Sequence, residues 1–526
     1  SRVAGTCAAK PSLRFGATLL GYRQEKARRS KSALRAALAD VGHRMQDTEV
    51  FDLAIVGTGF AAAFFLKNAL ASPDVGRVIV LERGKRHSYD WQLRNGRHND
   101  LSEPRPHRET GLSGKWWNYN IGFGGGSNCW WTNAMRIHPA DFELQSRYGV
   151  GTDWPIGYED LEPYYCDAED EMLVSGDNSS EVIFPRSRPF PQPRHRYSDI
   201  GLALKAAHPD TTFAMPTTRA RVVNDKRGVC CAVGQCDLCP SVAKFTIVEE
   251  MAYLFDDPRV TLVLEAEATA IETEAGQASA VLYRKDGVEH RAAARFVALA
   301  ANGIYNPFLL LKSGIDDGPV GRGVTEQIPI YLNIDFENAG NQGYSSLIGA
   351  VNYAFADGPH RALAAGGFLE ISSRFRVRPN AEKWNRNAFA VFLLGDLRDE
   401  ENRVSIDPDM PDRPLVTFRD WTPYARAGLA HVEASLEAFL APLGVERITA
   451  DYGHVSTHSH IEGSTVMGTD PATSVVDGDL RHHRVRNLAV LGSGAFPTSP
   501  GSNPTLTIAA LSLRAADRIF GTGTRQ

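Results

Sequence analysis

The sequence places four cysteines within ten residues, spaced C-C-x₄-C-x₂-C: Cys230, Cys231, Cys236 and Cys239. Thiolates this close together bind zinc or an iron–sulfur cluster, form disulfides, or pack as small buried side chains. Structural zinc sites usually contain two separated C-x₂-C pairs, and only Cys236 and Cys239 have that spacing. The spacing alone therefore leaves a metal centre and a structural role as alternatives.

Histidines form a second group of side chains able to do chemistry, at His454, His458 and His460 (HVSTHSH). Neutral imidazole accepts a proton near pH 7, because its ordinary pKa is about 6.5. The spacing differs from the H-E-x-x-H pattern of a zinc-binding helix. We interpret His454 as structural, and we expect the separate pair His482-His483, in a polar turn, to lie at the solvated surface.

Glycine spacing near residue 57 is typical of a nucleotide-binding turn. Gly57, Gly59 and Ala62 form G-x-G-x-x-A between the apolar run Phe51–Val56 and an apolar helical stretch. The first glycine permits a tight turn, the second lets a pyrophosphate approach the backbone, and the small third residue keeps helix and strand close. Glu82 ends the next apolar run, where an acid can bind a ribose hydroxyl. We therefore predict a dinucleotide site, which this motif alone does not assign to NAD or FAD.

The elements that must hold these residues follow from the apolar pattern. Residues 51–82 read as strand, turn, helix and strand, which is the start of an α/β fold. Residues 320–450 are rich in strand-like runs. These runs are Ile328–Phe336, Ser345–Phe355, Ala362–Ile371 and Ala388–Leu394.

The composition is that of an ordinary globular protein, with 43% hydrophobic and 23% charged residues among 526. This excludes disordered and fibrous classes. A net charge of -5 gives no indication of a nucleic-acid partner, and no apolar run reaches the roughly 18 residues of a membrane-spanning helix. Basic residues crowd the N-terminus, so we expect residues 1–50 to be a basic arm, with a targeting segment as the alternative.

Further segments carry a family signature. They are Gly122–Thr132 (GFGGGSNCWWT), Asp153–Tyr165 (DWPIGYEDLEPYY), Phe296–Gly314, His460–Ser464 and Asn487–Asp517. Together they resemble the glucose–methanol–choline (GMC) oxidoreductases, a family of FAD-dependent alcohol and sugar oxidoreductases. The resemblance implies an α/β fold in which a Rossmann-like FAD-binding domain is joined to a substrate-binding domain with an antiparallel sheet over the flavin.

The resemblance also implies an order of segments along the chain, with the FAD-binding domain built from three of them. This order is the basic arm (1–50), the first FAD-binding segment (51–160), a substrate or cap region with the Cys-rich loop (161–255), the second FAD-binding segment (256–320), the substrate-binding domain (321–450) and the third FAD-binding segment with the catalytic pair (451–526).

FAD is the cofactor that the resemblance implies. The implied contacts are Gly57, Gly59, Phe60, Ala62, Glu82, Arg83, Gly124, Gly125, Ser127, Asn128, Cys129, Ala268, Gly492, Ser493, Pro504 and Thr505. Cys129 stands where some relatives have a histidine bonded covalently to the flavin. We interpret it as a small buried residue beside non-covalent FAD, with a thioether link as the alternative.

The same resemblance implies a catalytic pair, His460 and Asn503. Oxidising an alcohol removes a hydroxyl proton and a carbinol hydride, and FAD accepts the hydride at its N5 position. His460 stands at the family's base position, and Asn503 is placed to orient the substrate oxygen or to stabilise its developing charge. For His458 the alternatives are a structural role, as for His454, and a position above the flavin.

The Cys-rich segment resembles the cluster loop of bacterial FAD-dependent sugar dehydrogenases. That likeness favours an iron–sulfur cluster on Cys230, Cys231, Cys236 and Cys239, followed by a structural role and then by zinc. A cluster would carry electrons away from the flavin, which suits a dehydrogenase.

We therefore expect an enzyme that oxidises a primary or secondary alcohol. Tryptophans near the Gly-rich loop (Trp116, Trp117, Trp130 and Trp131) suit a sugar-like or polyol substrate, although the alternative is that at least half of them are core. The expected electron acceptor is a partner protein or a quinone. The alternatives are an oxidase that uses O₂ and a non-catalytic flavin or iron–sulfur electron carrier. The expected location is the cytoplasm, with export to the periplasm as the alternative.

Overall fold

The computed structural model describes residues 50–232, 234, 236–453, 455 and 457–521. All but the last residue of the predicted basic arm, together with His454, lies outside the described residues. None of the helices in the described ranges is both long enough and apolar enough to cross a membrane.

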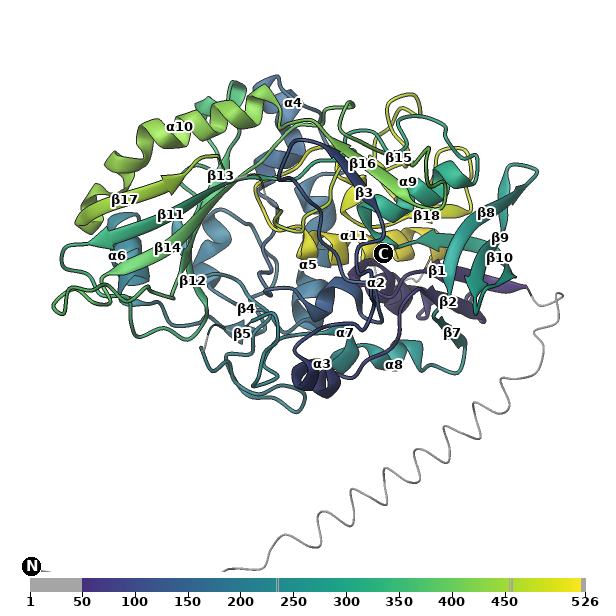
Figure 1. Ribbon diagram of the computed structural model, residues 1–526, viewed down its shortest axis with the longest axis horizontal. Helices are drawn as coiled ribbons and strands as arrows, with labels where there is room; N and C mark the ends of the chain where they lie inside the picture. The colour runs from purple at the N-terminus through teal and green to yellow at the C-terminus, as the bar shows by residue number, and fades with distance from the viewer. Residues whose placement is uncertain (1–49, 233, 235, 454, 456, 522–526) are drawn as a thin grey trace, which may run out of the picture. The chain divides into compact units, whose positions relative to one another are not determined.

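A seven-stranded sheet carries the predicted nucleotide-binding turn (Figure 1). Its parallel strands run in the order β7 (Val260–Leu264), β2 (Val78–Glu82), β1 (Phe51–Val56), β10 (Val288–Leu299) and β18 (Leu488–Val490). All but one of the residues in β1 and β2 are buried, as expected for parallel strands covered on both faces. The strands come from widely separated stretches of the chain, so the sheet closes only when the C-terminal block returns to it.

Two antiparallel strands extend this sheet, because β10 is twice as long as β1, its parallel partner. Its first half pairs with β9 (Gln277–Lys285), which in turn pairs with β8 (Glu267–Glu274). Helices α2 (Phe60–Ala69) and α11 (Thr505–Phe520) pack on each other in the main apolar core. The arrangement confirms the predicted α/β class.

A six-stranded antiparallel sheet forms the second layer. Its order is β17 (Val445–Asp451), β11 (Ile328–Phe336), β14 (Asn387–Leu394), β13 (Gly367–Ser372), β12 (Ile348–Asn352) and β6 (Thr212–Phe213). The four runs predicted from the sequence correspond to β11, β12, β13 and β14, with shorter bounds for β12 and β13. The predicted antiparallel substrate-domain sheet is therefore confirmed.

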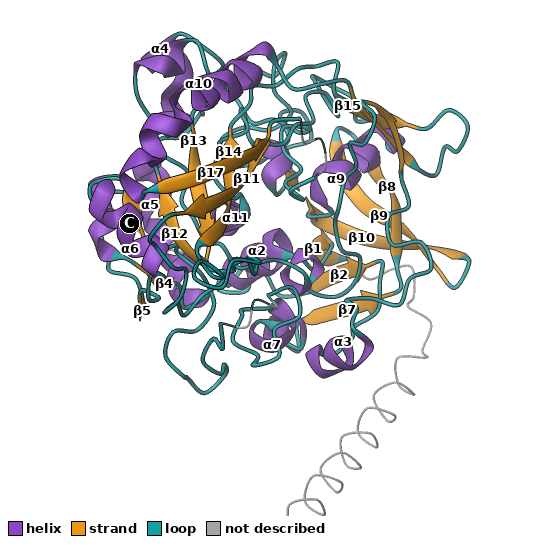
Figure 2. Ribbon diagram, turned by 60° about the vertical axis from the view of Figure 1, so that its left-hand side comes forward, coloured by secondary structure: helices purple, strands orange, loops and turns teal. Residues whose placement is uncertain are grey.

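Alternation along β11 gives this sheet two different faces. Ile330, Leu332 and Ile334 are buried in a cluster that includes apolar residues of α10 (Pro423–Leu440), the long helix beside the sheet in Figure 2. Tyr331 and Asn333 lie between them in sequence and therefore point to the opposite face. That face lines the cavity described below.

The remaining elements connect these layers. The helices are α3 (Tyr89–Asn95), α4 (Leu144–Tyr148), α5 (Tyr158–Glu171), α6 (Asp199–Ala207), α7 (Ile247–Glu250), α8 (Ala252–Phe255) and α9 (Asn302–Lys312). The strands are β3 (Arg108–Gly111), β4 (Ser175–Gly176), β5 (Gln192–Pro193), β15 (Arg403–Ile406) and β16 (Pro414–Phe418).

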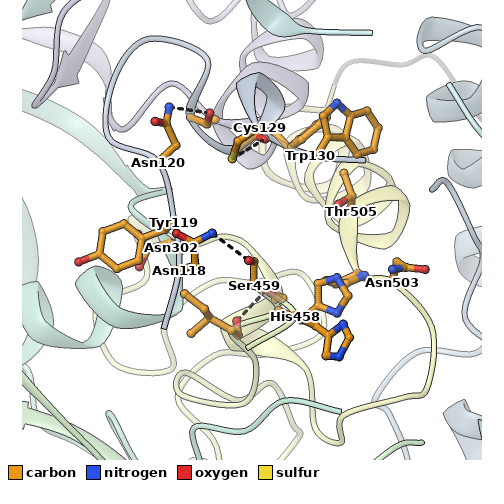
Figure 3. Close-up of a pocket in the computed structure, with 18 of the residues that line it drawn as sticks. Asn118, Tyr119, Asn120, Cys129, Trp130, Asn302, His458, Ser459, Asn503 and Thr505 are labelled. Carbon is orange, nitrogen blue, oxygen red and sulfur yellow. Dashed lines mark hydrogen bonds between the residues drawn. The ribbon is translucent and has the colours of Figure 1, made fainter. Parts of the chain in front are cut away.

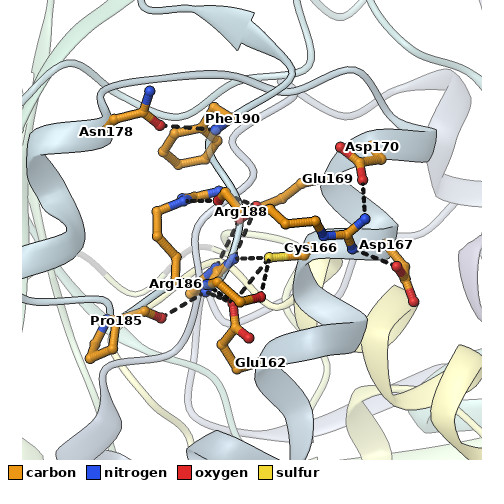
Figure 4. Close-up of polar contacts among 12 residues, drawn as sticks. Glu162, Cys166, Asp167, Glu169, Asp170, Asn178, Pro185, Arg186, Arg188 and Phe190 are labelled. Atoms are coloured by element: carbon orange, nitrogen blue, oxygen red, sulfur yellow. Dashed lines mark hydrogen bonds and ion pairs between the residues drawn. The ribbon is translucent and has the colours of Figure 1, made fainter. Parts of the chain in front are cut away.

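The Pro-rich run 184–194, which composition predicts to be an extended surface loop, is tied to α5 by buried charges (Figure 4). Arg186 and Arg136 both pair with Glu169, and all three side chains are at most 3% exposed. The Arg186 guanidinium also lies 3.6 Å from the centre of the Phe190 ring, which is buried. The surface-loop prediction is therefore wrong around Arg186 and Phe190, because an arginine paired with an interior glutamate is held inside.

The prediction that His482 lies at the solvated surface is also wrong. Its side chain is 1% exposed, and its Nδ1 accepts hydrogen bonds from the backbone N–H groups of Arg484 and Val485, at 3.3 and 3.1 Å. The imidazole thus closes the turn from inside, which a polar composition does not reveal.

Candidate active site

One cavity of about 970 Å³ collects most of the residues singled out from the sequence. Its size is at the upper end of the range for small-molecule and cofactor sites, about 300–1,000 Å³. It is lined by the turn after β1, the end of β2, the Gly-rich segment near residue 125, the start of α9, one face of the second sheet and the loops at 457–461 and 491–505. Figure 3 shows side chains from several of these segments around one space.

The turn after β1 forms a close backbone cradle at one end of the cavity. Gly57 has φ +105°, and a Cβ on it would lie 2.6 Å from the carbonyl oxygen of Ala300. Gly59 caps the N-terminus of α2 without any side-chain hydrogen bond. Gly125 approaches it so closely that a Cβ on Gly125 would lie 3.0 Å from the Gly59 Cα. The N–H groups of the first turn of α2 are therefore left to a ligand, as a pyrophosphate site requires.

Glu82 lies at the end of β2, lines the cavity and is 6% exposed. Its carboxylate accepts hydrogen bonds from Thr58 Oγ1 at 2.6 Å and from the N–H groups of Gly84 and Gly122 at 2.8 and 3.1 Å. A carboxylate offers about four acceptor positions, so one remains for a ribose hydroxyl. Glu82 thus both fastens the cradle and fits the predicted ribose contact.

Most of the implied FAD contacts line the cavity. They are Gly57, Gly59, Phe60, Glu82, Arg83, Gly125, Cys129, Ala268, Gly492, Ser493, Pro504 and Thr505. The other four lie behind the wall and support it: Ala62, Gly124, Ser127 and Asn128. Ser127 shows how, since its hydroxyl donates to the Gly124 carbonyl at 2.7 Å and accepts from the Ile247 N–H at 3.1 Å.

The cradle, the uncapped helix and the acid at the end of β2 together fit a dinucleotide such as FAD. Cys129 borders the same space, and its Sγ contacts the Gly126 carbonyl at 3.5 Å. Burial raises the pKa of this thiol, so it remains protonated and is a poor nucleophile. This property accords with the interpretation of Cys129 as a neighbour of non-covalent FAD, which stays a prediction.

His460 is held so that one ring nitrogen faces the cavity. Its Nδ1 lies 2.8 Å from Gln327 Oε1, while Nε2 has no partner in the described ranges of the chain. Gln327 Nε2 donates to the carbonyls of Pro500 and Ser502, at 2.8 and 3.1 Å, and this fixes which end of the amide accepts. Because Oε1 can only accept, Nδ1 must carry the hydrogen, and Nε2 keeps its lone pair. Burial lowers the pKa of His460 to about 3, so the ring is neutral.

Glu326 holds the loop that carries His460. Its Oε1 accepts from Thr457 Oγ1 and from the N–H groups of His458 and His460, at 2.8, 2.7 and 3.0 Å. Its other oxygen pairs with the buried Lys115 ammonium, which lies over the Trp117 ring. Burial opposes ionisation of Glu326, but Lys115 outweighs it and keeps the pKa of this carboxyl below its ordinary value.

Lys115, Glu326 and Gln327 were not predicted from the sequence. The pair Glu326-Gln327 directly precedes the apolar run of β11, and both residues are 0% exposed. Two polar residues joined to a buried strand are a weak signal that something nearby needs hydrogen bonds. Lys115 gave no such signal, because its partner is more than 200 residues away.

Asn503 lines the cavity directly after the loop whose carbonyls Gln327 holds. Its Oδ1 is buried without a hydrogen-bond partner in the described residues, so the amide is available for a ligand. His458 also borders the cavity, and its Nε2 contacts the Tyr331 hydroxyl at 3.0 Å. The structure therefore brings the predicted pair His460 and Asn503 to one space.

The four cysteines of the Cys-rich segment do not come together as a ligand set. Cys236 and Cys239 are buried in different apolar clusters, Cys230 packs beside Cys239, and Cys231 is exposed. No group of three or more potential metal ligands occurs among the described residues. The residues as arranged do not fit a cluster or a zinc ion.

Other contacts give this segment a structural role. Cys236 Sγ accepts from the Arg219 guanidinium at 2.7 Å. Lys244 Nζ donates to the carbonyls of Asn128 and Asp237, at 2.6 and 2.5 Å, and so ties the segment to the Gly-rich wall of the cavity.

Only one of the four tryptophans is a buried core residue, fewer than expected. Trp130 and Trp131 line the cavity, and Trp131 is 51% exposed. Trp117 is buried in the core of the second layer, and Trp116 lies outside the cavity beside Arg105.

Comparisons with known proteins agree with this geometry. The C-terminal family model described as GMC oxidoreductase matches residues 399–512. The chain is 32% identical to the fructose dehydrogenase large subunit of Gluconobacter japonicus, over 76% of this chain and 80% of that protein. It is 28% identical to paromamine 6'-oxidase of Streptomyces fradiae, over 90% and 92%. The crystal structure of pyridoxine 4-oxidase from Mesorbium loti has the same fold, with a TM-score of 0.61 and 17% identity over 89% of this chain and 99% of that one.

Proposed function

The chain belongs to the GMC oxidoreductase family, whose members act on CH–OH groups with FAD, and on that premise we propose that it oxidises an alcohol group of a sugar-like or polyol molecule with His460 as the base. The observation that carries the proposal is the place of His460 in the cavity wall, with its Nδ1 held 2.8 Å from Gln327 Oε1.

Alcohol oxidation removes a proton from oxygen and a hydride from carbon, and the C–O bond becomes C=O. Bound FAD would supply the hydride acceptor. His460 Nε2 takes the hydroxyl proton, since Gln327 holds the hydrogen of the ring on Nδ1. The amide of Asn503 contacts the substrate oxygen while charge develops on it.

The cavity wall supports a polar substrate. Beyond the predicted FAD contacts it carries the amides of Asn118 and Asn333, together with aromatic rings such as Trp131 and Phe389. Amides bind hydroxyls, and aromatic rings contact the apolar faces of sugar rings. The relatives are named for fructose and for paromamine, which accords with such a substrate.

We propose an electron acceptor other than O₂, a partner protein or a quinone, on the ground that the 32% identical relative is named a dehydrogenase. The relative named an oxidase, at 28% identity, favours O₂ as the alternative. Because the cysteines in the described residues do not form a ligand set, we assign no electron path through the Cys-rich segment.

The test is anaerobic reduction of the bound flavin by single alcohols, followed by absorbance. Fructose, sorbitol and glucosamine represent polyfunctional substrates, and 1-hexanol represents a simple alcohol. The proposal predicts that at least one polyfunctional alcohol bleaches the flavin and that a quinone restores its absorbance faster than O₂ does. Absence of bleaching by every alcohol would refute the function, and faster recovery with O₂ would refute the acceptor.

A further inference from the structure

The wall that the second sheet gives to the cavity contains a carboxylate that the proposed chemistry does not use. Glu370 lies on β13 and lines the cavity, although only 8% of it is exposed. Strand register places Glu370 beside Val391 on β14, and Val391 beside Tyr331 on β11. All three side chains line the cavity, so Glu370 faces the same space as His460.

The contacts of Glu370 leave one of its oxygens open. Asn133 Nδ2 donates to Oε1 at 2.9 Å, and no other donor among the described residues contacts the carboxylate. The buried Arg219 forms no ion pair with it among the described residues and acts on it only through its charge. The Nε and Nη1 of that guanidinium hydrogen-bond Thr217 and Cys236, while Nη2 has no hydrogen-bond partner in the described ranges. Burying a carboxyl group with a single hydrogen bond is costly, which indicates that a ligand supplies the missing partner.

Asn133 also has an unpaired polar atom, and the backbone directly before it is strained. It is 7% exposed, and its Oδ1 has no hydrogen-bond partner within the described ranges. The preceding Thr132 has φ +72°, which is rare and unfavourable for a β-branched residue. A hydrogen bond of 2.9 Å between the hydroxyls of Thr132 and Thr217 holds this conformation. Such strain persists where the surrounding structure needs a side chain in a particular place, here Asn133 against Glu370.

The surroundings make the open carboxylate a strong recognition element. Val391 lies opposite Glu370 on β14, and Leu393 and Ile348 lie opposite the residues two positions before and after it on β13; all three line the cavity. A ligand's hydrogen bond to Glu370 would lie among these apolar side chains and away from water. Such a bond is stronger than one at the protein surface. Burial also raises the pKa of Glu370 to about 7, with Asn133 and Arg219 opposing the shift, so the group has both protonation states near neutral pH. Tyr331 and Tyr353 are the other titratable groups whose pKa values are affected by the charge of Glu370.

We propose that Glu370 and Asn133 form a second anchoring point for the substrate, which receives a hydrogen-bond-donating group, a hydroxyl or an ammonium, remote from the carbon that is oxidised. Glu370 is two strands away from Tyr331, roughly 10 Å at a strand spacing of about 4.8 Å, and Tyr331 contacts His458. A substrate that binds at this anchoring point must therefore carry a second donor several atoms from its carbinol, whereas an alcohol without one binds more weakly and independently of Glu370. This inference rests on the proposed function and narrows its substrates to polyfunctional alcohols.

Kinetics of the intact flavoprotein test the anchoring point. Glu370→Leu should raise the KM for fructose and for glucosamine by about 10- to 100-fold, as expected for losing a hydrogen bond to a charged group, and should leave 1-hexanol oxidation unchanged. Glu370→Gln keeps an acceptor oxygen without the charge. At pH 8 this variant should raise the KM for fructose only a few-fold. If the bound donor is an ammonium, the KM for glucosamine should rise tenfold or more; if the donor is a hydroxyl, the KM values for the two substrates should rise equally.

Glu250→Gln is the matched control. Glu250 is buried with a pKa also raised to about 7, but it pairs with Arg227 and does not line the cavity. It should change neither KM. Equal preference for fructose over 1-hexanol in the wild type and in Glu370→Leu, at equal flavin content, would overturn the inference while leaving the proposed function intact. If no alcohol reduces the wild-type flavin, the proposed function itself fails.

Discussion

His460 is the residue whose protonation decides whether the proposed chemistry can start. An imidazole with its ordinary pKa of about 6.5 would lose its base form below that pH, and the rate would fall about tenfold for each further pH unit. In this fold burial lowers the pKa of His460 to about 3, so the ring stays neutral well into the acid range.

We therefore expect that protonation of His460 does not lower the rate of anaerobic flavin reduction between pH 8 and pH 5. Glu370 titrates near pH 7, so the profile should be recorded in Glu370→Gln as well as in the wild type. A tenfold fall per pH unit below 6.5 in both proteins would contradict the neutral ring.

A single backbone position decides whether the cradle can form. Gly57→Ala forces a Cβ to 2.6 Å from the Ala300 carbonyl at a φ of +105°. The variant should be purified with far less flavin per chain than the wild type. Gly96→Ala is its control, because Gly96 also has a positive φ but nothing lies within 4 Å of its Cβ position. Normal flavin content in Gly57→Ala would show that the turn does not hold the cofactor.

At the scale of elements, Gln327 joins the start of β11 to two loops. One amide orients His460 and also binds the carbonyls that precede Asn503. Gln327→Leu should slow flavin reduction by about 100-fold, the effect of misplacing a reacting group by about 1 Å.

Gln327→Glu separates orientation from general packing. Its carboxylate still accepts from His460 Nδ1 but adds a negative charge, which raises the pKa of the imidazole. It also loses the hydrogen bonds that Gln327 Nε2 donates to the carbonyls of Pro500 and Ser502, as Gln327→Leu does. The variant should keep more activity than Gln327→Leu at pH 8 and should lose rate as the pH falls, unlike the wild type. Identical pH profiles for the two variants would mean that Gln327 only fills space.

The loop 184–194 and helix α5 depend on a buried glutamate. Glu169→Ala leaves the guanidinium groups of Arg136 and Arg186 without this partner inside the protein, which should lower the free energy of unfolding by about 3–5 kcal/mol. Asp170→Ala breaks only an exposed pair with Arg188, seen beside it in Figure 4, and should cost about 1 kcal/mol or less. Equal urea midpoints for the two variants would contradict a stabilising role for the buried charges.

Over the whole molecule, the features that could be predicted from the sequence are those that short-range patterns determine. The turn at Gly57, the strand runs of the second sheet and the pair His460 and Asn503 all follow from local spacing or from family resemblance. Contacts across hundreds of residues did not follow, such as Lys115 with Glu326 or Asn133 with Glu370. Buried polar residues were the hardest to place, because His482 and Arg186 look like surface residues until their partners are known.

The Cys-rich segment shows the opposite difficulty. The spacing of its cysteines suits metal ligands, yet the fold buries Cys236 and Cys239 in different apolar clusters. Spacing along a loop does not determine whether side chains converge, because the loop has no period of its own. The turn between β1 and α2 was easier to predict, because a strand–turn–helix unit imposes its geometry.

The proposed function depends most on His460 taking the proton from the substrate hydroxyl. Its most direct test is the rate of anaerobic flavin reduction by fructose, or by whichever sugar or polyol reduces the wild type, in His460→Ala at equal flavin content. Proton abstraction by His460 predicts a rate lower by about 10²–10⁴-fold, the usual contribution of a general base. Reduction at the wild-type rate would contradict it.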